Sequence, residues 1–354
     1  MRPCSPQVEL QENATLTIME IQFLYTETCT NPTRARDVFR EMRDIGADSV
    51  VICVYEQDLL RWTKDLPRLF DEAAKAGLRR YVSYGRFGGA FSGALMVPSL
   101  FTFLRPDTGI VPSDPKKATD GEADVAASEY FHRISCVNHP AFRKYMADQT
   151  HEILTTFQPD GLLFDEPKGL RLVCECKHCI AARKKDETPA EANLRFQVEF
   201  VRALADQAKA HRDGICTALV VGSNDDDSLA SFARIRSLDV LGTEAYWVNR
   251  RKDMRWLRAW CPKEVQRLRS LGKKAQVWAG NYGLARAQQE DLAEMYRIIA
   301  DAQPDQLANF WWWRGSEDPE RVMELTKRGI QEVRSGAIHR AEGRGKTQQR
   351  KTAR

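Results

Sequence analysis

Eight short apolar runs, each followed by residues with helical spacing, divide most of this 354-residue chain. Between the runs, stretches such as residues 33–46, 140–154 and 190–211 are amphipathic with a helical period and predict helices. The runs themselves have almost no polar alternation, which is typical of parallel strands covered by helices. The predicted strands are residues 15–26, 48–55, 79–85, 161–166, 216–223, 239–247, 274–281 and 307–313.

Eight strand-helix units in one chain favour an α/β fold of the closed (β/α)8 type, the TIM barrel. An open, doubly wound sheet is the alternative. We expect a short N-terminal segment over residues 1–14, the barrel over residues 15–335, and a tail over residues 336–354. The tail has few apolar residues, so we expect it to be disordered. Its charged residues are Arg340, Arg344, Lys346, Arg350, Lys351 and Arg354 against Glu342.

The predicted strands are unevenly spaced, and the extra length follows strands 3 and 4. The first insertion, residues 86–135, is rich in Gly, Pro and Asp and predicts a long irregular segment. Loops that follow strands lie at the C-terminal face of a barrel, where barrel enzymes carry their sites. We therefore expect both insertions to wall a pocket.

Composition limits where the chain works and what it binds. No apolar run reaches the roughly 18 residues that a membrane-spanning helix needs, and the N-terminus lacks the pattern of a secretion signal. We expect a cytoplasmic protein. The formal net charge of +4 comes from the tail, which leaves the body close to neutral. A specific nucleic-acid partner is therefore not expected, and a homo-oligomer stays open.

Four cysteines fall at the two insertions. Cys174, Cys176 and Cys179 form a C-x-C-x-x-C run, and Cys136 ends the first insertion. Because the cytoplasm keeps thiols reduced, such a cluster favours a metal site over disulfides. Four thiolates would make a closed tetrahedral zinc site that ties the insertions together. Unliganded thiols or a redox pair are the alternatives, with His139 and His178 as substitute ligands.

Two motifs around these cysteines resemble the family 42 glycoside hydrolases of the β-galactosidase type. They are SCVNHPAFRKY from Ser135 and FDEPKGLRLVCECKHCIAARKK from Phe164. The resemblance implies that Cys136, Cys174, Cys176 and Cys179 bind a structural zinc. It also implies that Glu166, which ends strand 4, is the general acid/base. Asp165 stands where the family has Asn.

The chain departs from that family at strand 7. The family's nucleophile is a Glu at the end of that strand, but KAQVWAGNYGLA contains no carboxylate. Cleavage of a glycosidic bond needs a second carboxyl group besides the acid. Glu244, at the end of strand 6, is our candidate for it, and Asp165 would raise the pKa of its neighbour by like charge. Glu27, Glu56 and Asp58 are lesser candidates.

Aromatic and polar side chains at the predicted strand ends suit a carbohydrate, whose rings stack on flat apolar surfaces. We expect substrate contacts from Trp247, Trp278, Trp313, Tyr246, Asn281, Arg314 and Arg86. The sequence thus predicts a glycoside hydrolase acting on an oligosaccharide or glycoside. The alternative is a catalytically inactive carbohydrate-binding or scaffold barrel that keeps the zinc site. A third hypothesis, a zinc-assisted hydrolase, would need an open metal position.

Overall fold

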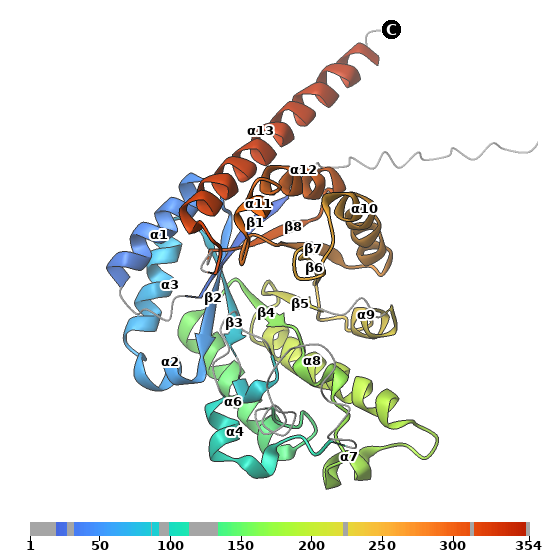
Figure 1. The fold of residues 1–354 in the computed structure, drawn as a ribbon. Coiled ribbons are helices and arrows are strands. Elements are labelled where there is room, and N and C mark those ends of the chain that lie inside the picture. Colours follow the sequence, from blue (N-terminus) through green and yellow to red (C-terminus); the bar gives the residue numbers. More distant parts are fainter. Residues whose placement is uncertain are drawn as a thin grey trace, which may run out of the picture.

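The computed structural model contains a closed barrel of eight parallel strands, β1 to β8, in sequence order (Figure 1). It describes residues 19–26, 32–85, 87–91, 99–112, 134–221, 226–311 and 315–351, with side chains in the last range described as far as Gly336. The predicted (β/α)8 fold is confirmed. The strands are β1 Glu20–Tyr25, β2 Ser49–Tyr55, β3 Arg79–Gly85, β4 Gly161–Asp165, β5 Cys216–Val220, β6 Val240–Ala245, β7 Lys274–Ala279 and β8 Gln306–Phe310.

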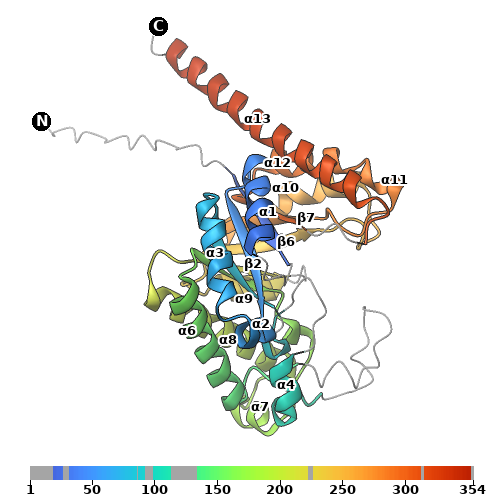
Figure 2. The same ribbon diagram turned by 90° about the vertical axis from the view of Figure 1, so that its left-hand side faces the viewer.

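Helices cover the outside of the barrel, and a further group extends beyond one end of it (Figures 1 and 2). That group includes α4 and α7, which belong to the segments that follow β3 and β4. The helices are α1 Pro32–Asp44, α2 Glu56–Arg61, α3 Asp65–Lys75, η1 Phe87–Gly89, α4 Leu100–Leu104, η2 Pro106–Thr108, α6 Pro140–Phe157, η4 Lys168–Arg171, α7 Lys177–Ala182, α8 Pro189–His211, α9 Asp226–Ala233, α10 Met254–Ser270, α11 Arg286–Gln289, α12 Leu292–Ala302 and α13 Pro319–Lys351.

Local sequence explains where the longer helices begin. The Thr188 side chain accepts from the backbone N–H of Glu191, and the Glu191 carboxylate accepts from Thr188 in return, so α8 starts with a capping box. Pro189 occupies its first turn, where no backbone donor is needed. Asp253 caps α10 by accepting from the backbone N–H of Trp256. These caps fix where α8 and α10 begin, and α10 packs on β6 and β7.

Alternation along the strands separates two apolar layers. Residues such as Phe23, Val50, Phe164 and Leu241 point outward and pack under the helices. The inward layer fills the barrel and consists of Leu24, Val51, Cys53, Tyr55, Tyr81, Leu163, Ala218, Val220, Val240, Trp278, Ala308 and Phe310. The interior is therefore packed, and functional groups must lie at its ends.

Three glutamines carry a hydrogen-bond chain through this interior. Gln276 Nε2 donates to the side-chain oxygens of Gln22 at 2.8 Å and Gln306 at 3.0 Å. Both of those amides donate in turn to the Glu20 carboxylate, at 3.1 and 2.9 Å. At the other end, the Trp278 indole N–H donates to Gln276 Oε1 at 2.8 Å. We call this chain the glutamine network.

The last helix, α13, binds backbone groups that precede β1 and β2. The Arg334 guanidinium of α13 donates to the carbonyl of Met19 at 3.0 Å and to that of Gly46 at 2.7 Å. Beyond the body, α13 projects away from the barrel as far as Lys351 (Figure 2). The backbone of α13 runs past Gly336, where the tail was expected to begin, and the expected disorder of that tail stays a prediction. Among the described residues, no helix combines the length and apolarity that crossing a bilayer requires.

Candidate functional site

The end of β4 presents two consecutive carboxylates at the C-terminal face of the barrel. Asp165 is the last residue of the strand, on the same inward side as Leu163. Glu166 follows with a φ of 38°, the left-handed conformation that costs a residue with a side chain of order 1 kcal/mol or more. Its backbone N–H still donates to the Val220 carbonyl of β5 at 3.1 Å. The turn therefore begins at Glu166 itself, where the side chain leaves the strand's alternation.

Glu244 lies two strands away on β6 and points into the barrel, like Val240 on the same strand. It is 9% exposed, and its register partner on β7 is Trp278. This carboxylate lies in the last inward layer of the barrel, near the C-terminal ends of the strands, where barrel enzymes carry their catalytic groups.

Two tyrosines lie within electrostatic range of all three carboxylates. Burial raises the pKa of Tyr246, and the charges of Glu244, Asp165 and Glu166 raise it further. The pKa of Tyr282 is raised to about 12, chiefly by burial and also by the charges of the same three carboxylates. The hydrogen bond that Asn249 Nδ2 donates to its hydroxyl acts in the opposite direction. The C-terminal ends of β4 and β6 thus place their acidic groups within electrostatic range of the same two tyrosines.

Aromatic rings form one wall of this space. The Tyr246 and Tyr282 rings meet edge to face with centroids 5.5 Å apart. Phe310, at the end of β8, lies 4.5 Å from the Tyr282 ring, 5.9 Å from Tyr246 and 5.4 Å from Trp278. Sequence reasoning missed Phe310, because it extended strand 8 to residue 313 whereas β8 ends three residues earlier. The inward alternation of Ala308 and Phe310 was the signal for it.

Other expected substrate contacts occupy different places. Trp247 belongs to the outer apolar layer and packs against Gly280, since β6 ends at Ala245 and the chain turns before the ring. Asn281 is fully buried and bridges to β8: its Nδ2 donates to the Phe310 carbonyl at 2.9 Å, and its Oδ1 accepts from the Phe310 N–H at 3.0 Å. We therefore leave both out of the site. Arg86, Trp313 and Arg314, like Glu27, lie outside the described residues.

The four cysteines do come together, beside this end of the barrel. The sulfur atoms of Cys136, Cys174, Cys176 and Cys179 all lie within 4.8 Å of one another. The Cys136 sulfur is 3.3 Å from that of Cys179 and 3.7 Å from that of Cys176. Four sulfurs at about 2.3 Å from a tetrahedral zinc are about 3.8 Å apart, so this donor set fits the ion.

The cluster joins the segments that follow β3 and β4. Isolated antiparallel bridges connect Phe91 to Pro167 and Pro112 to Cys174. The Val111 carbonyl accepts from the Glu175 N–H at 2.6 Å, and the Val111 N–H donates to the Cys174 sulfur at 3.4 Å. Because Pro167 directly follows Glu166, these contacts also fix the position of the candidate acid.

Glu56, one of the lesser candidates, binds the segment that follows β3. Its buried carboxylate accepts from the backbone N–H of Gly88 at 2.7 Å, from the Ser99 hydroxyl at 3.1 Å and from the Tyr145 hydroxyl at 3.1 Å. Burial nevertheless raises its pKa. These contacts engage the carboxylate in holding α4 and α6 together, which is a structural role.

Comparisons with known proteins complete the description of this site. No family model matches the chain, and no curated protein matches its sequence. Solved structures with a similar fold include the endo-β-1,4-mannanase from Thermotoga petrophila, with a TM-score of 0.56 and 12% identity over 90% of this chain and 78% of that one. The β-galactosidase from Halorubrum lacusprofundi has a TM-score of 0.61 and 15% identity over 89% and 58%.

A second β-galactosidase, from Rahnella sp. R3, has a TM-score of 0.63 and 12% identity, over 92% of this chain and 57% of that one. The chain thus spans less than two thirds of the length of both β-galactosidases. At these identities, the similarity shows the barrel fold that the proteins share.

Proposed function

We propose that this protein is a glycoside hydrolase that cleaves an oligosaccharide or glycoside at the C-terminal face of its barrel. The observation that supports the proposal is that Asp165 and Glu244 point inward from the C-terminal ends of β4 and β6, with Glu166 directly after Asp165. Two carboxyl groups facing one space are the minimum equipment for cleaving a glycosidic bond. The adjoining aromatic wall offers a flat apolar surface for a sugar ring.

The carboxylates would divide the work. Glu166, protonated, would donate its proton to the glycosidic oxygen as the bond to the anomeric carbon breaks. Glu244, ionised, would either attack that carbon or take a proton from the attacking water. The left-handed backbone at Glu166 would aim the acid away from the strand and into the site.

We further propose a structural zinc on Cys136, Cys174, Cys176 and Cys179. Four thiolate ligands leave no open coordination position, so the ion would stabilise the fold and take no part in bond cleavage. Its effect on activity would be indirect, through the segment that carries Pro167. The need for reduced thiols suits the cytoplasmic setting that we propose for the protein.

A relationship to family 42 is supported by the two sequence motifs around the cysteines and by the β-galactosidases among the similar structures. We infer from it that the substrate carries a terminal sugar, which binds at the C-terminal face of the barrel. The departures are Asp165, in place of the family's Asn, and the absence of a carboxylate in β7 and the residues up to Tyr282.

The missing carboxylate after β7 favours a second candidate, a carbohydrate-binding barrel without hydrolysis. The position after β7 holds Gly280 and the buried Asn281, so no acidic group reaches the mouth from this strand. In this case the aromatic wall would still bind sugar, whereas the carboxylates would only form hydrogen bonds to its hydroxyl groups.

Turnover of chromogenic glycosides separates the two candidates. A panel of aryl glycosides of different sugars and both anomeric configurations would be tested with the parent, Glu166→Gln and Asp148→Asn as a surface control. Hydrolysis by the parent and the control, with a loss of about 1,000-fold in Glu166→Gln, is the expected result. Sugar binding without turnover in all three proteins would favour the binding barrel instead.

A further inference from the structure

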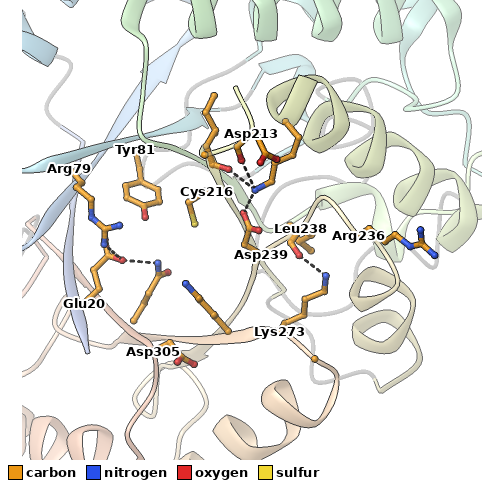
Figure 3. A pocket seen from close by; sticks show the side chains of 16 residues that line it. Glu20, Arg79, Tyr81, Asp213, Cys216, Arg236, Leu238, Asp239, Lys273 and Asp305 are labelled. Atoms are coloured by element: carbon orange, nitrogen blue, oxygen red, sulfur yellow. Dashed lines mark hydrogen bonds and ion pairs between the residues drawn. The ribbon is translucent and has the colours of Figure 1, made fainter. Parts of the chain in front are cut away.

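A cavity of about 660 Å³ opens at the opposite end of the barrel from the candidate site. It lies where β1, β3, β5, β7 and β8 begin, and we call it the floor cavity (Figure 3). Its volume falls in the range of about 300 to 1,000 Å³ that small-molecule sites occupy. Its walls are Glu20, Arg79, Tyr81, Lys209, Asp213, Gly214, Ile215, Cys216, Arg236, Leu238, Asp239, Gly272, Lys273, Lys274, Asp305 and Gln306.

Most carboxylates around the floor cavity are already neutralised. Glu20 forms an ion pair with Arg79, and Asp239 accepts from Lys209 at 2.7 Å (Figure 3). Asp305 pairs with Arg269, which lies outside the cavity. The acidic side chains therefore have little charge to offer a cation.

Lys274 carries a charge that the floor cavity can offer to a ligand. Its side chain is exposed, and among the residues that the structure describes it makes no ion pair or side-chain hydrogen bond. Lys273 differs, because its ammonium donates to the carbonyls of Ile235 at 2.7 Å and Leu238 at 2.5 Å. Arg236 points away from the cavity in Figure 3. The charges that the cavity offers to a ligand are thus those of Lys274 and of Arg79, which keeps its ion pair with Glu20.

A buried hydroxyl is also available. Tyr81 is 1% exposed, and its hydroxyl lacks a hydrogen-bond partner of normal geometry although it points into the floor cavity (Figure 3). The group beside it is the Cys216 thiol, which burial keeps protonated by raising its pKa to about 11. A thiol is a weak hydrogen-bond partner, so a polar atom of a ligand would make a stronger bond to this buried hydroxyl.

Arg79 is held ready by the interior of the barrel. Its ion-pair partner Glu20 accepts from both Gln22 and Gln306, so the glutamine network fixes the carboxylate that orients the guanidinium. Preorganised donors of this kind lower the entropy cost of binding.

We propose that the floor cavity binds a small organic molecule that carries a carboxylate or phosphate group together with hydroxyl groups. Lys274 and Arg79 hold the anionic group, and the Tyr81 hydroxyl bonds to a polar atom of the ligand. This site is separate from the carboxylates of β4 and β6, and the inference stands whether or not the protein hydrolyses glycosides.

The test is isothermal titration calorimetry with glycerol 3-phosphate, glycerate and glycerol, which share a small skeleton and differ in charge. The proteins are the parent, Lys274→Gln, Tyr81→Phe and the matched control Lys263→Gln, which removes an exposed charge on α10. Circular dichroism melting verifies that each variant folds. Lys274→Gln and Lys263→Gln both alter exposed side chains, so the fold should survive in both.

We expect glycerol 3-phosphate, glycerate or both to bind the parent and Lys263→Gln with equal affinity. Glycerol should bind to neither of these two proteins. Lys274→Gln should weaken anion binding by about tenfold or more, as loss of a charge-assisted hydrogen bond does, and Tyr81→Phe by a smaller factor. Comparison of the two anions shows which acidic group is preferred. The proposal is overturned if neither anion binds, if glycerol binds as tightly, or if Lys274→Gln binds like the parent.

Discussion

Glu244 and Trp278 are register partners on the neighbouring strands β6 and β7. The indole N–H of Trp278 is directed down the barrel to Gln276, so the ring is held in one orientation. Glu244 therefore has a fixed apolar neighbour on the β7 side. This pairing places an aromatic ring at the inward position of β7, so the inward carboxylate of this pair of strands comes from β6.

Glu244→Ala should reduce turnover of an aryl glycoside by about 1,000-fold if the carboxylate acts on the anomeric carbon or on water. The anomer that the parent first releases, read by NMR, tells the two roles apart. A sugar that retains the configuration of the substrate would indicate that Glu244 is a nucleophile, and a sugar of the opposite configuration would indicate a base that activates water. A variant with full activity would remove Glu244 from the mechanism.

Glu166→Gly and Glu166→Gln should differ in stability although both lose the carboxylate. Glycine adopts the φ of 38° without strain, so we expect the free energy of unfolding of the Gly variant to be about 0.5 to 1 kcal/mol higher than that of the Gln variant. Urea unfolding followed by circular dichroism measures the difference. Equal stabilities would mean that the left-handed conformation stores no strain at this position.

Cys176→Ser should release the metal and lower the melting temperature. The parent is expected to contain about one zinc per chain by elemental analysis, and the variant much less. Cys216→Ser is the matched control, since that thiol lies far from the cluster at the start of β5 and should leave the metal content unchanged. A parent purified without any metal, and stable to chelators, would contradict the zinc proposal.

Gln276→Leu should destabilise the barrel by about 3 kcal/mol. The substitution keeps the volume but removes the partner of the Trp278 indole and of the oxygens of Gln22 and Gln306, which stay buried. Denaturant unfolding measures the loss. Gln207→Leu is the control: its amide donates to the Ala147 carbonyl at the surface, and its loss should cost under about 1 kcal/mol.

Asp58→Asn should change how stability depends on pH. Burial raises the pKa of Asp58 from 3.8 to about 6, against a hydrogen bond from the Tyr55 N–H. Because the folded pKa is the higher one, the protonated form stabilises the fold below about pH 4, and this contribution is lost as the pH rises through about 6. The melting temperature of the variant relative to the parent should therefore rise by about 3 °C between these limits. An unchanged difference would contradict the shift.

The barrel could be predicted from the sequence because each strand is a short apolar run and each helix is periodic. All eight predicted strands are present, and their starts agree closely for β2 to β7. Their ends agree less well, because a buried strand passes into an apolar turn without any change of composition. Trp247 was placed on β6 for this reason, whereas it lies in the turn that follows.

The site was predictable only in part for the same reason. The sequence grouped Cys136 with the other three thiols, and it brought Glu166 and Glu244 to one face through the order of the strands. It could not show that Asn281 is used up in binding the backbone of Phe310, or that Glu166 adopts a left-handed backbone, since both depend on tertiary contacts. The floor cavity had no signal, because its residues come from strand starts that are far apart in the chain.

The glutamine network also constrains how this chain can change over evolutionary time. Gln276 bonds to both other amides, so its mutation leaves the oxygens of Gln22 and Gln306 without their donor. Stepwise drift would pass through poorly folding intermediates. Descendants of the same ancestor should therefore inherit Gln22, Gln276 and Gln306 as a block, or replace all three together with apolar residues.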